Sequence, residues 1–98
     1  MVIKSMALFK VTSVIDGDTF TVPVWYSSQN SGTVVRPSGY NTPEQGEPGY
    51  VQAKTKLSSL ILGKDVELGD AVNFDHGRIV CPVFYAGRNL ADYFPEYK

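Results

Sequence analysis

The most constraining feature of the sequence is a strictly alternating segment directly after a tight-turn signal. Between residues 19 and 26 a large apolar side chain occupies every second position: Phe20, Val22, Val24 and Tyr26. A period of two is typical of a half-buried β-strand. The preceding Asp16-Gly17 pair is typical of a two-residue hairpin turn, so residues 7–15 are predicted to form the partner strand. The chain therefore begins its fold with an antiparallel hairpin.

A third strand is predicted at residues 33–36, after a polar loop at 27–32, and it ends near Pro37. The longest irregular segment follows at 39–49, where glycines and prolines interrupt every regular pattern. Long loops of this kind in small domains often carry functional residues. We therefore expect this loop to contribute to a site.

A helix is predicted at residues 50–62, because its apolar residues fall on one helical face: Ala53, Leu57, Leu60 and Ile61. Gly63 ends it, since glycine readily adopts the left-handed conformation of a helix cap. Two more strands are expected at 64–68 and 78–85, and a short helix at 89–93. The order of three strands, one helix and two strands favours a five-stranded OB-fold barrel. On pattern alone, an open α+β sheet with one helix remains an alternative.

Composition limits the size and class of the protein. With 98 residues and 43% hydrophobic content, residues 1–98 are expected to form a single, mainly β domain. The single cysteine, Cys81, excludes an intrachain disulfide, and with His76 it is too small a set for a zinc site. The net charge of −1 disfavours a protein that clamps long nucleic acids, so phosphate contacts should be few and local.

No apolar run approaches the length needed to span a membrane. The first ten residues lack the long apolar stretch of a signal peptide. We therefore expect no membrane partner, and a protein that is cytoplasmic or that was secreted with its signal removed.

Two carboxylates and two arginines lie where the rim of a barrel would bring them together: Asp18 at the first hairpin, Arg36 and Arg78 at strand ends, and Glu44 in the loop after the third strand. A hard cation bound by oxygen ligands can polarise a phosphodiester, and a carboxylate can activate a water. Guanidinium groups then balance the charge that grows on the phosphate oxygens. On pattern alone, however, Asp18 could be a turn cap, and Arg36 and Glu44 could form a structural ion pair.

Several short motifs follow one another along the chain: VIDGDT at 14–19, VR at 35–36, GYNTPE at 39–44, the helix start at 49–53, the segment at 60–64, GR at 77–78, Gly87, and NL at 89–90. In the same order, they resemble the IDGDT, VRLxGIDTPE, helix, GKxV and YGR…GxNL motifs of the staphylococcal nuclease (thermonuclease) family. The resemblance runs from about residue 11 to residue 90.

The resemblance implies an OB-fold barrel and a calcium-dependent nuclease that hydrolyses phosphodiester bonds of DNA and RNA. It implies that Asp18 is a calcium ligand and that Thr42 is one through its backbone carbonyl. Asn41 stands where the family usually has a metal-binding aspartate. Because an amide oxygen carries no charge, we predict weaker binding of Ca²⁺.

The resemblance also assigns the catalytic groups. Glu44 would place or activate the water, and Arg36 and Arg78 would contact the scissile phosphate. His76 stands in place of a tyrosine that helps the family to bind a terminal phosphate. Pro37, next to Arg36, interrupts the third strand.

Two further expectations follow from departures from the family pattern. The C-terminal helices of the family are largely missing, which predicts exposed apolar surface that a homodimer could cover. Asn41 and the short C-terminus also keep open an alternative function. In it, the chain is a catalytically weakened or inactive module of the same fold that binds nucleic acid or protein.

Overall fold

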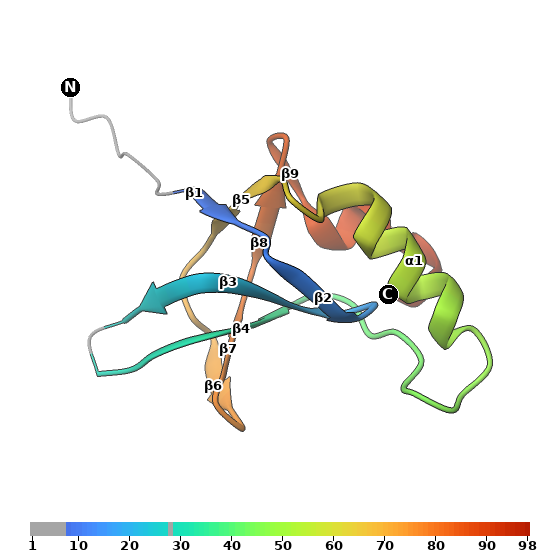
Figure 1. Cartoon of the computed structure of the whole chain (residues 1–98), viewed down its shortest axis with the longest axis horizontal. Helices are drawn as coiled ribbons and strands as arrows, with labels where there is room; N and C mark the ends of the chain where they lie inside the picture. Colours follow the sequence, from blue (N-terminus) through green and yellow to red (C-terminus); the bar gives the residue numbers. More distant parts are fainter. Residues whose placement is uncertain (1–7, 28) are drawn as a thin grey trace.

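The computed structural model describes residues 8–27 and 29–98 and contains two β-sheets, one α-helix and two short 3₁₀-helices (Figure 1). Parts of two expected elements, residue 7 of the first strand and residue 28 of the first loop, lie outside the described residues. One sheet has five strands in the spatial order β2 (Ser13–Asp16), β3 (Thr19–Tyr26), β4 (Ser31–Pro37), β7 (Arg78–Cys81) and β6 (Asn73–Asp75). The other has four, in the order β1 (Leu8–Lys10), β5 (Asp65–Leu68), β8 (Val83–Tyr85) and β9 (Arg88–Asn89).

The predicted N-terminal hairpin is confirmed. Strands β2 and β3 pair antiparallel, with Val14 opposite Phe20 and Asp16 opposite Thr19. The two turn residues are Gly17 and Asp18 rather than the predicted Asp16 and Gly17, because Asp16 is still paired as the last residue of β2. The register shifts between Val14 and Asp16, which is the signature of a bulge. The bulge bends the end of β2 next to the turn that carries Asp18.

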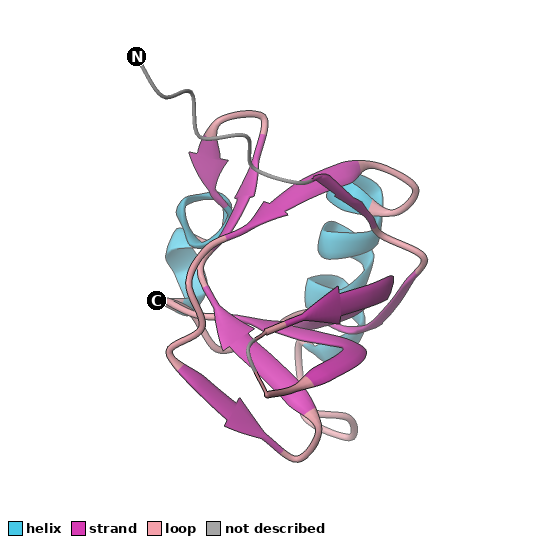
Figure 2. Ribbon diagram, turned by 90° about the vertical axis from the view of Figure 1, so that its left-hand side faces the viewer, coloured by secondary structure: helices cyan, strands magenta, loops and turns pink. Residues whose placement is uncertain are grey.

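Two segments expected to be single strands are each divided between the sheets. The first divides at Val11, whose N–H donates to the Lys64 carbonyl while its own carbonyl accepts from Gly63 N–H. The second divides at Pro82, which has no N–H to donate to a neighbouring strand, while its carbonyl accepts a hydrogen bond from the Gly69 N–H. At both points the chain leaves one sheet and enters the other, so the two sheets share a common interior (Figure 2).

The expectation of a mainly β fold is confirmed, and so is a helix between the third and fourth expected strands. Helix α1 (Tyr50–Ile61) lies between β4 and β5 in the chain. Pairing among the described strands gives two sheets, and it does not close into a single barrel. Strand β6 was not predicted from the sequence. The expected short C-terminal helix is present as η1 (Leu90–Tyr93), and η2 (Pro95–Tyr97) follows it.

The core lies between the two sheets and is closed on one side by α1 (Figure 2). The helix buries Ala53, Leu57 and Ile61, which are three of the four residues that define its predicted apolar face. From the C-terminus, Phe94 is fully buried in the same core. Among the described residues, no helix is both long and apolar enough to cross a membrane.

Candidate active site

The Gly17-Asp18 turn lies against α1 and against the loop that precedes α1. A Cβ at Gly17 would lie 2.6 Å from Ala53 Cβ and 2.8 Å from Thr42 Oγ1, so only glycine allows this approach. Asp18 is 9% exposed. Its Oδ1 accepts a hydrogen bond from the Thr19 hydroxyl at 3.2 Å, and its Oδ2 accepts one from the Thr42 N–H at 3.1 Å. The hairpin and the loop are therefore joined through this carboxylate.

Arg36, at the end of β4, lies beside the same carboxylate. Its Nη2 is 3.3 Å from Asp18 Oδ2 and also donates to Asn41 Oδ1. Its Nη1 donates to the carbonyls of Pro37 at 2.9 Å and Tyr40 at 3.3 Å. Four acceptors thus fix the guanidinium, and its ion-pair partner is Asp18. The structural ion pair between Arg36 and Glu44 that the sequence left open is not present among the described ion pairs.

Arg78, at the start of β7, lies on the same face of the sheet as Arg36. Strands β4 and β7 are parallel, with Val34 opposite Arg78 and Arg36 opposite Val80. The two arginines are therefore two register positions apart, and side chains two positions apart share a face.

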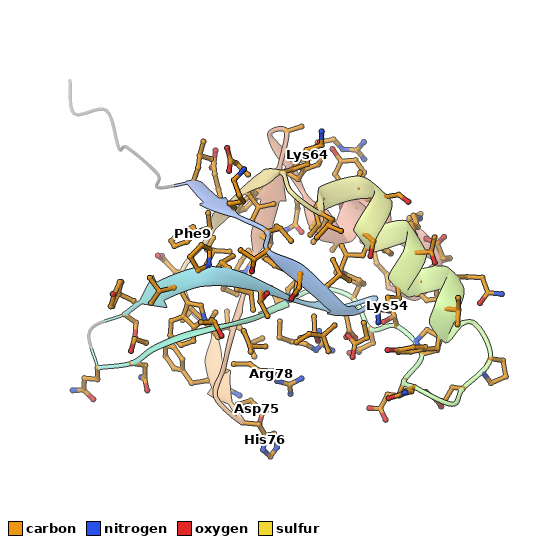
Figure 3. All side chains as sticks on the ribbon, viewed as in Figure 1. Phe9, Lys54, Lys64, Asp75, His76 and Arg78 are labelled. Carbon is orange, nitrogen blue, oxygen red and sulfur yellow. The ribbon has the colours of Figure 1, made fainter. Side chains whose placement is uncertain are left out.

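Asp75 holds the Arg78 side chain in place. Arg78 Nη2 donates to Asp75 Oδ2 at 2.9 Å, and its Nε donates to the Asp75 carbonyl at 3.3 Å. His76 approaches the other oxygen of the same carboxylate, with Nε2 3.1 Å from Asp75 Oδ1. Figure 3 shows these three side chains together at the turn between β6 and β7. His76 is 84% exposed, so it lies outside any enclosed pocket.

Glu44 lies in the loop between β4 and α1, and it is exposed. Its backbone N–H donates to Glu47 Oε1 at 2.6 Å, which closes a local turn. No hydrogen bond or ion pair of the Glu44 carboxylate occurs among the described residues. The carboxylate is therefore available to a ligand.

All six site residues predicted from the sequence line one cavity of about 400 Å³. Its lining comprises Asp16, Asp18, Arg36, Asn41, Thr42, Pro43, Glu44, Glu47 and Arg78. The hairpin, the end of β4, the loop and the start of β7 each contribute to this lining. A second cavity of about 480 Å³ shares Arg36 and Asn41 with the first and extends toward Tyr97 and Lys98.

Two acidic residues of the cavity were not predicted as site residues. Asp16 was interpreted only as a turn residue, although its place in the Asp-Gly-Asp sequence was the available signal. Partial burial raises the pKa of Asp16, and the neighbouring Asp18 raises it further. Glu47 carried no sequence signal, because it lies in an irregular loop between two prolines.

The oxygen donors of the cavity fit a hard divalent cation. The Asp18 carboxylate lies close enough to Asp16 to disfavour ionisation of Asp16, and a cation between two such carboxylates relieves that repulsion. The Asn41 amide is a third oxygen donor, and Ca²⁺ accepts amide, carbonyl and water oxygens. Among the described residues, no cluster of three His, Cys, Asp or Glu side chains could hold a metal unaided. Amide, backbone and water oxygens would complete the set.

Tyr40 lies behind the cavity and is 4% exposed. Its hydroxyl donates to the Gly17 carbonyl at 2.9 Å. Burial, followed by the nearby Asp18 charge, raises the pKa of Tyr40 well above its usual value. The hydroxyl therefore remains a proton donor to Gly17 throughout the neutral range.

Comparison of the sequence with models of protein families gives no match, and comparison with curated proteins gives none.

Proposed function

We propose that the protein is a calcium-dependent, thermonuclease-like phosphodiesterase that hydrolyses DNA or RNA. The observation that carries the proposal is the single cavity lined by Asp18, Asn41, Glu44 and the two arginines. These residues come from segments up to 60 positions apart in the chain, and their side chains are of the types that metal-assisted cleavage of a phosphodiester requires. The motif resemblance gives the same roles to the same residues.

The fold is part of the same proposal. We interpret the two sheets as the two halves of an OB-type barrel, because the chain passes from one to the other at Val11 and at Pro82. Oligonucleotide sites are common on folds of this type.

Asp18, Asn41 and the Thr42 carbonyl would hold the calcium ion, with Asp16 beside them. When bound, the ion supplies electrophilic polarisation of the phosphate. Asp18 is nearly buried and keeps a backbone donor on one oxygen, so its position is fixed before any ligand enters. Such preorganisation is what a metal site needs from its protein ligands.

Glu44 takes the proton of the attacking water. Its carboxylate lines the cavity and is exposed, and the bond from its backbone N–H to Glu47 fixes the local turn. A carboxylate in this position contributes about 10²–10⁴-fold to such a reaction.

Arg36 and Arg78 bind the phosphate oxygens, where negative charge grows in the transition state. Guanidinium suits this role because it stays protonated and donates two parallel hydrogen bonds. Asp75 orients Arg78 through two contacts, and the Arg78 side chain stays 29% exposed to solvent and lines the cavity. Arg36 is oriented by the carbonyls of Pro37 and Tyr40.

The test is an assay of single-stranded DNA and RNA cleavage with added Ca²⁺, Mg²⁺ or Mn²⁺. Glu44→Gln and Arg78→Lys are each expected to lower kcat by about a hundredfold, the scale of losing one acid–base group or one charge donor. Matched controls are Glu67→Gln on β5 and Arg88→Lys on β9, which lie in the other sheet and should retain activity. A wild-type protein inactive with all three cations, or full activity in both site variants, would refute the proposal.

One observation favours a second candidate, a binding module of the same fold without catalysis. The Arg36 guanidinium contacts both Asp18 and Asn41. Two of the proposed calcium ligands are therefore already paired with a positive charge that belongs to the protein. Calorimetric titration with Ca²⁺, with and without a nucleoside bisphosphate, separates the two functions. Heat from calcium supports the enzyme, and no heat from either ligand supports a module that binds protein.

A further inference from the structure

Tyr40 connects three segments that surround the proposed site. Its hydroxyl donates to the Gly17 carbonyl at 2.9 Å, in the turn that carries Asp18. Its ring stacks on Phe94 with 4.6 Å between centroids and 12° between planes. A residue of the site loop is thus joined by its side chain to the hairpin on one side and to the C-terminal segment on the other.

The backbone around Tyr40 is fixed in the same way. The Tyr40 carbonyl accepts from Arg36 Nη1 at 3.3 Å. The next N–H, that of Asn41, donates to the Tyr97 carbonyl at 3.0 Å. The C-terminal segment is itself attached to α1, because Lys56 donates to both carboxylate oxygens of Glu96. Side chain and backbone therefore hold Asn41 from both sides.

The contact with Gly17 bears directly on Asp18. Gly17 precedes Asp18 in the turn, and Asp18 Oδ2 accepts from the Thr42 N–H two residues after Tyr40. The hairpin and the loop thus meet at two points, the Tyr40 hydroxyl and the Thr42 amide. If the hydroxyl is lost, the buried Gly17 carbonyl loses its donor, and the carboxylate contact alone must hold the two segments in register.

We infer that Tyr40 is a positioning residue for the proposed hydrolysis, with its hydroxyl setting the distance between Asp18 and the loop that carries Asn41 and Thr42. The inference rests on the proposed function for its catalytic meaning. Tyr40 is absent from the lining of the cavity that holds Asp18, so it acts through the residues it holds. Residues that orient ligands from behind typically change metal affinity or activity by about 10–100-fold.

The chain offers a matched control in Tyr50, at the start of α1. Its hydroxyl donates to the Ile15 carbonyl at 3.1 Å, so it also reaches the end of the same hairpin. That bond lies on the outside of the molecule and does not touch Gly17 or the site loop. Tyr40→Phe and Tyr50→Phe therefore each remove one hydroxyl that donates to the same hairpin, and only the Tyr40 hydroxyl joins the hairpin to the site loop.

The experiment compares these two variants of the full chain by amide hydrogen exchange and by calcium calorimetry. Tyr40→Phe is expected to speed exchange of the Thr42 N–H about tenfold, as the loss of one buried hydrogen bond does, while core amides such as Val35 are unchanged. Tyr40→Phe should also raise the Kd for calcium about tenfold and lower kcat about tenfold, while KM stays within about twofold of the wild-type value. Tyr50→Phe should leave all of these near their wild-type values.

Equal effects of the two variants, or a rise in exchange spread evenly over the core, would overturn the inference. If Tyr40→Phe does not fold, Phe94→Leu is the second variant: it removes the ring that seats Tyr40, which weakens the bond from the Tyr40 hydroxyl to Gly17, so it must speed exchange at Thr42 more than at Val35. If the wild-type protein neither cleaves nor binds calcium, the proposed function fails, but the exchange comparison still decides the positioning role. An unchanged Thr42 amide in Tyr40→Phe then refutes that role separately.

Discussion

Replacing Asn41 by aspartate tests how much calcium affinity the proposed site loses because Asn41 carries no charge. The Asn41 amide oxygen lines the cavity and accepts from Arg36, next to the Asp18 carboxylate. Asn41→Asp keeps the shape of the side chain and adds one negative charge. If the site binds Ca²⁺, this variant should bind it more tightly, because each added carboxylate increases the attraction for a hard cation.

The expected size of the effect follows from the exposure of Asn41 and from the position of Arg36. Two unit charges about 4 Å apart attract by about 1 kcal/mol in water, and an exposed residue such as Asn41 is closest to that limit. The double charge of calcium raises the gain to about 2 kcal/mol, while the competing attraction of the new carboxylate for Arg36 removes about 1 kcal/mol. The net gain is about 1 kcal/mol, or a Kd about fivefold lower.

The measurement is calorimetric titration of wild-type protein, Asn41→Asp and Asn73→Asp with Ca²⁺. Asn73 is the matched control, since it is also an asparagine and lines only the second cavity. Asn73→Asp should change the Kd for calcium by less than about twofold, because its new carboxylate attracts the ion only over a longer, screened distance. Unchanged or weaker binding in Asn41→Asp, or equal gains in both variants, would show that Asn41 is not a calcium ligand.

Two further predictions concern stability and reactivity. Gly17→Ala should lower the free energy of unfolding, measured in urea, by about 1–3 kcal/mol, because the added Cβ would overlap Ala53. In the control Gly69→Ala the nearest neighbour of the added Cβ is 3.3 Å away, so the loss should be much smaller. Equal losses in the two variants would show that the contact of Gly17 with α1 is not tight. Burial raises the pKa of the Cys81 thiol to about 11. A disulfide reagent at pH 8 should therefore modify Cys81 only after denaturation. Rapid modification of the native protein would contradict the burial of this thiol. The neutral thiol also links stability to pH: its contribution is complete below pH 9.0 and is lost as pH rises toward about 11, because only the unfolded chain ionises in that window.

Local sequence patterns predicted the elements whose formation depends on near neighbours. The first hairpin, which turns at Gly17-Asp18, and helix α1 depend on alternation, turn residues and helical spacing. Each of these signals lies within about a dozen consecutive residues. Strand β6 was missed because its three residues, Asn73–Asp75, contain a single apolar side chain, Phe74, and its pairing with β7 depends on a turn at His76 with positive φ. The divisions at Val11 and Pro82 were missed because they are set by contacts with distant segments.

In the candidate site, too, the sequence predicted which residues take part but not which side chains contact each other. Chemistry and motif order selected six residues, and all six line one cavity. The sequence could not assign the partner of Arg36, because that partner depends on the antiparallel pairing of β3 with β4 and on the bulge before Asp18. The resulting contact of Arg36 with Asp18 and Asn41 has a consequence for function. If calcium takes one of these two ligands, Arg36 Nη2 gains a free donor for a phosphate, while Nη1 keeps its bonds to the carbonyls of Pro37 and Tyr40. Binding of cation and binding of phosphate should therefore reinforce each other, with each ligand raising the affinity for the other by the same factor.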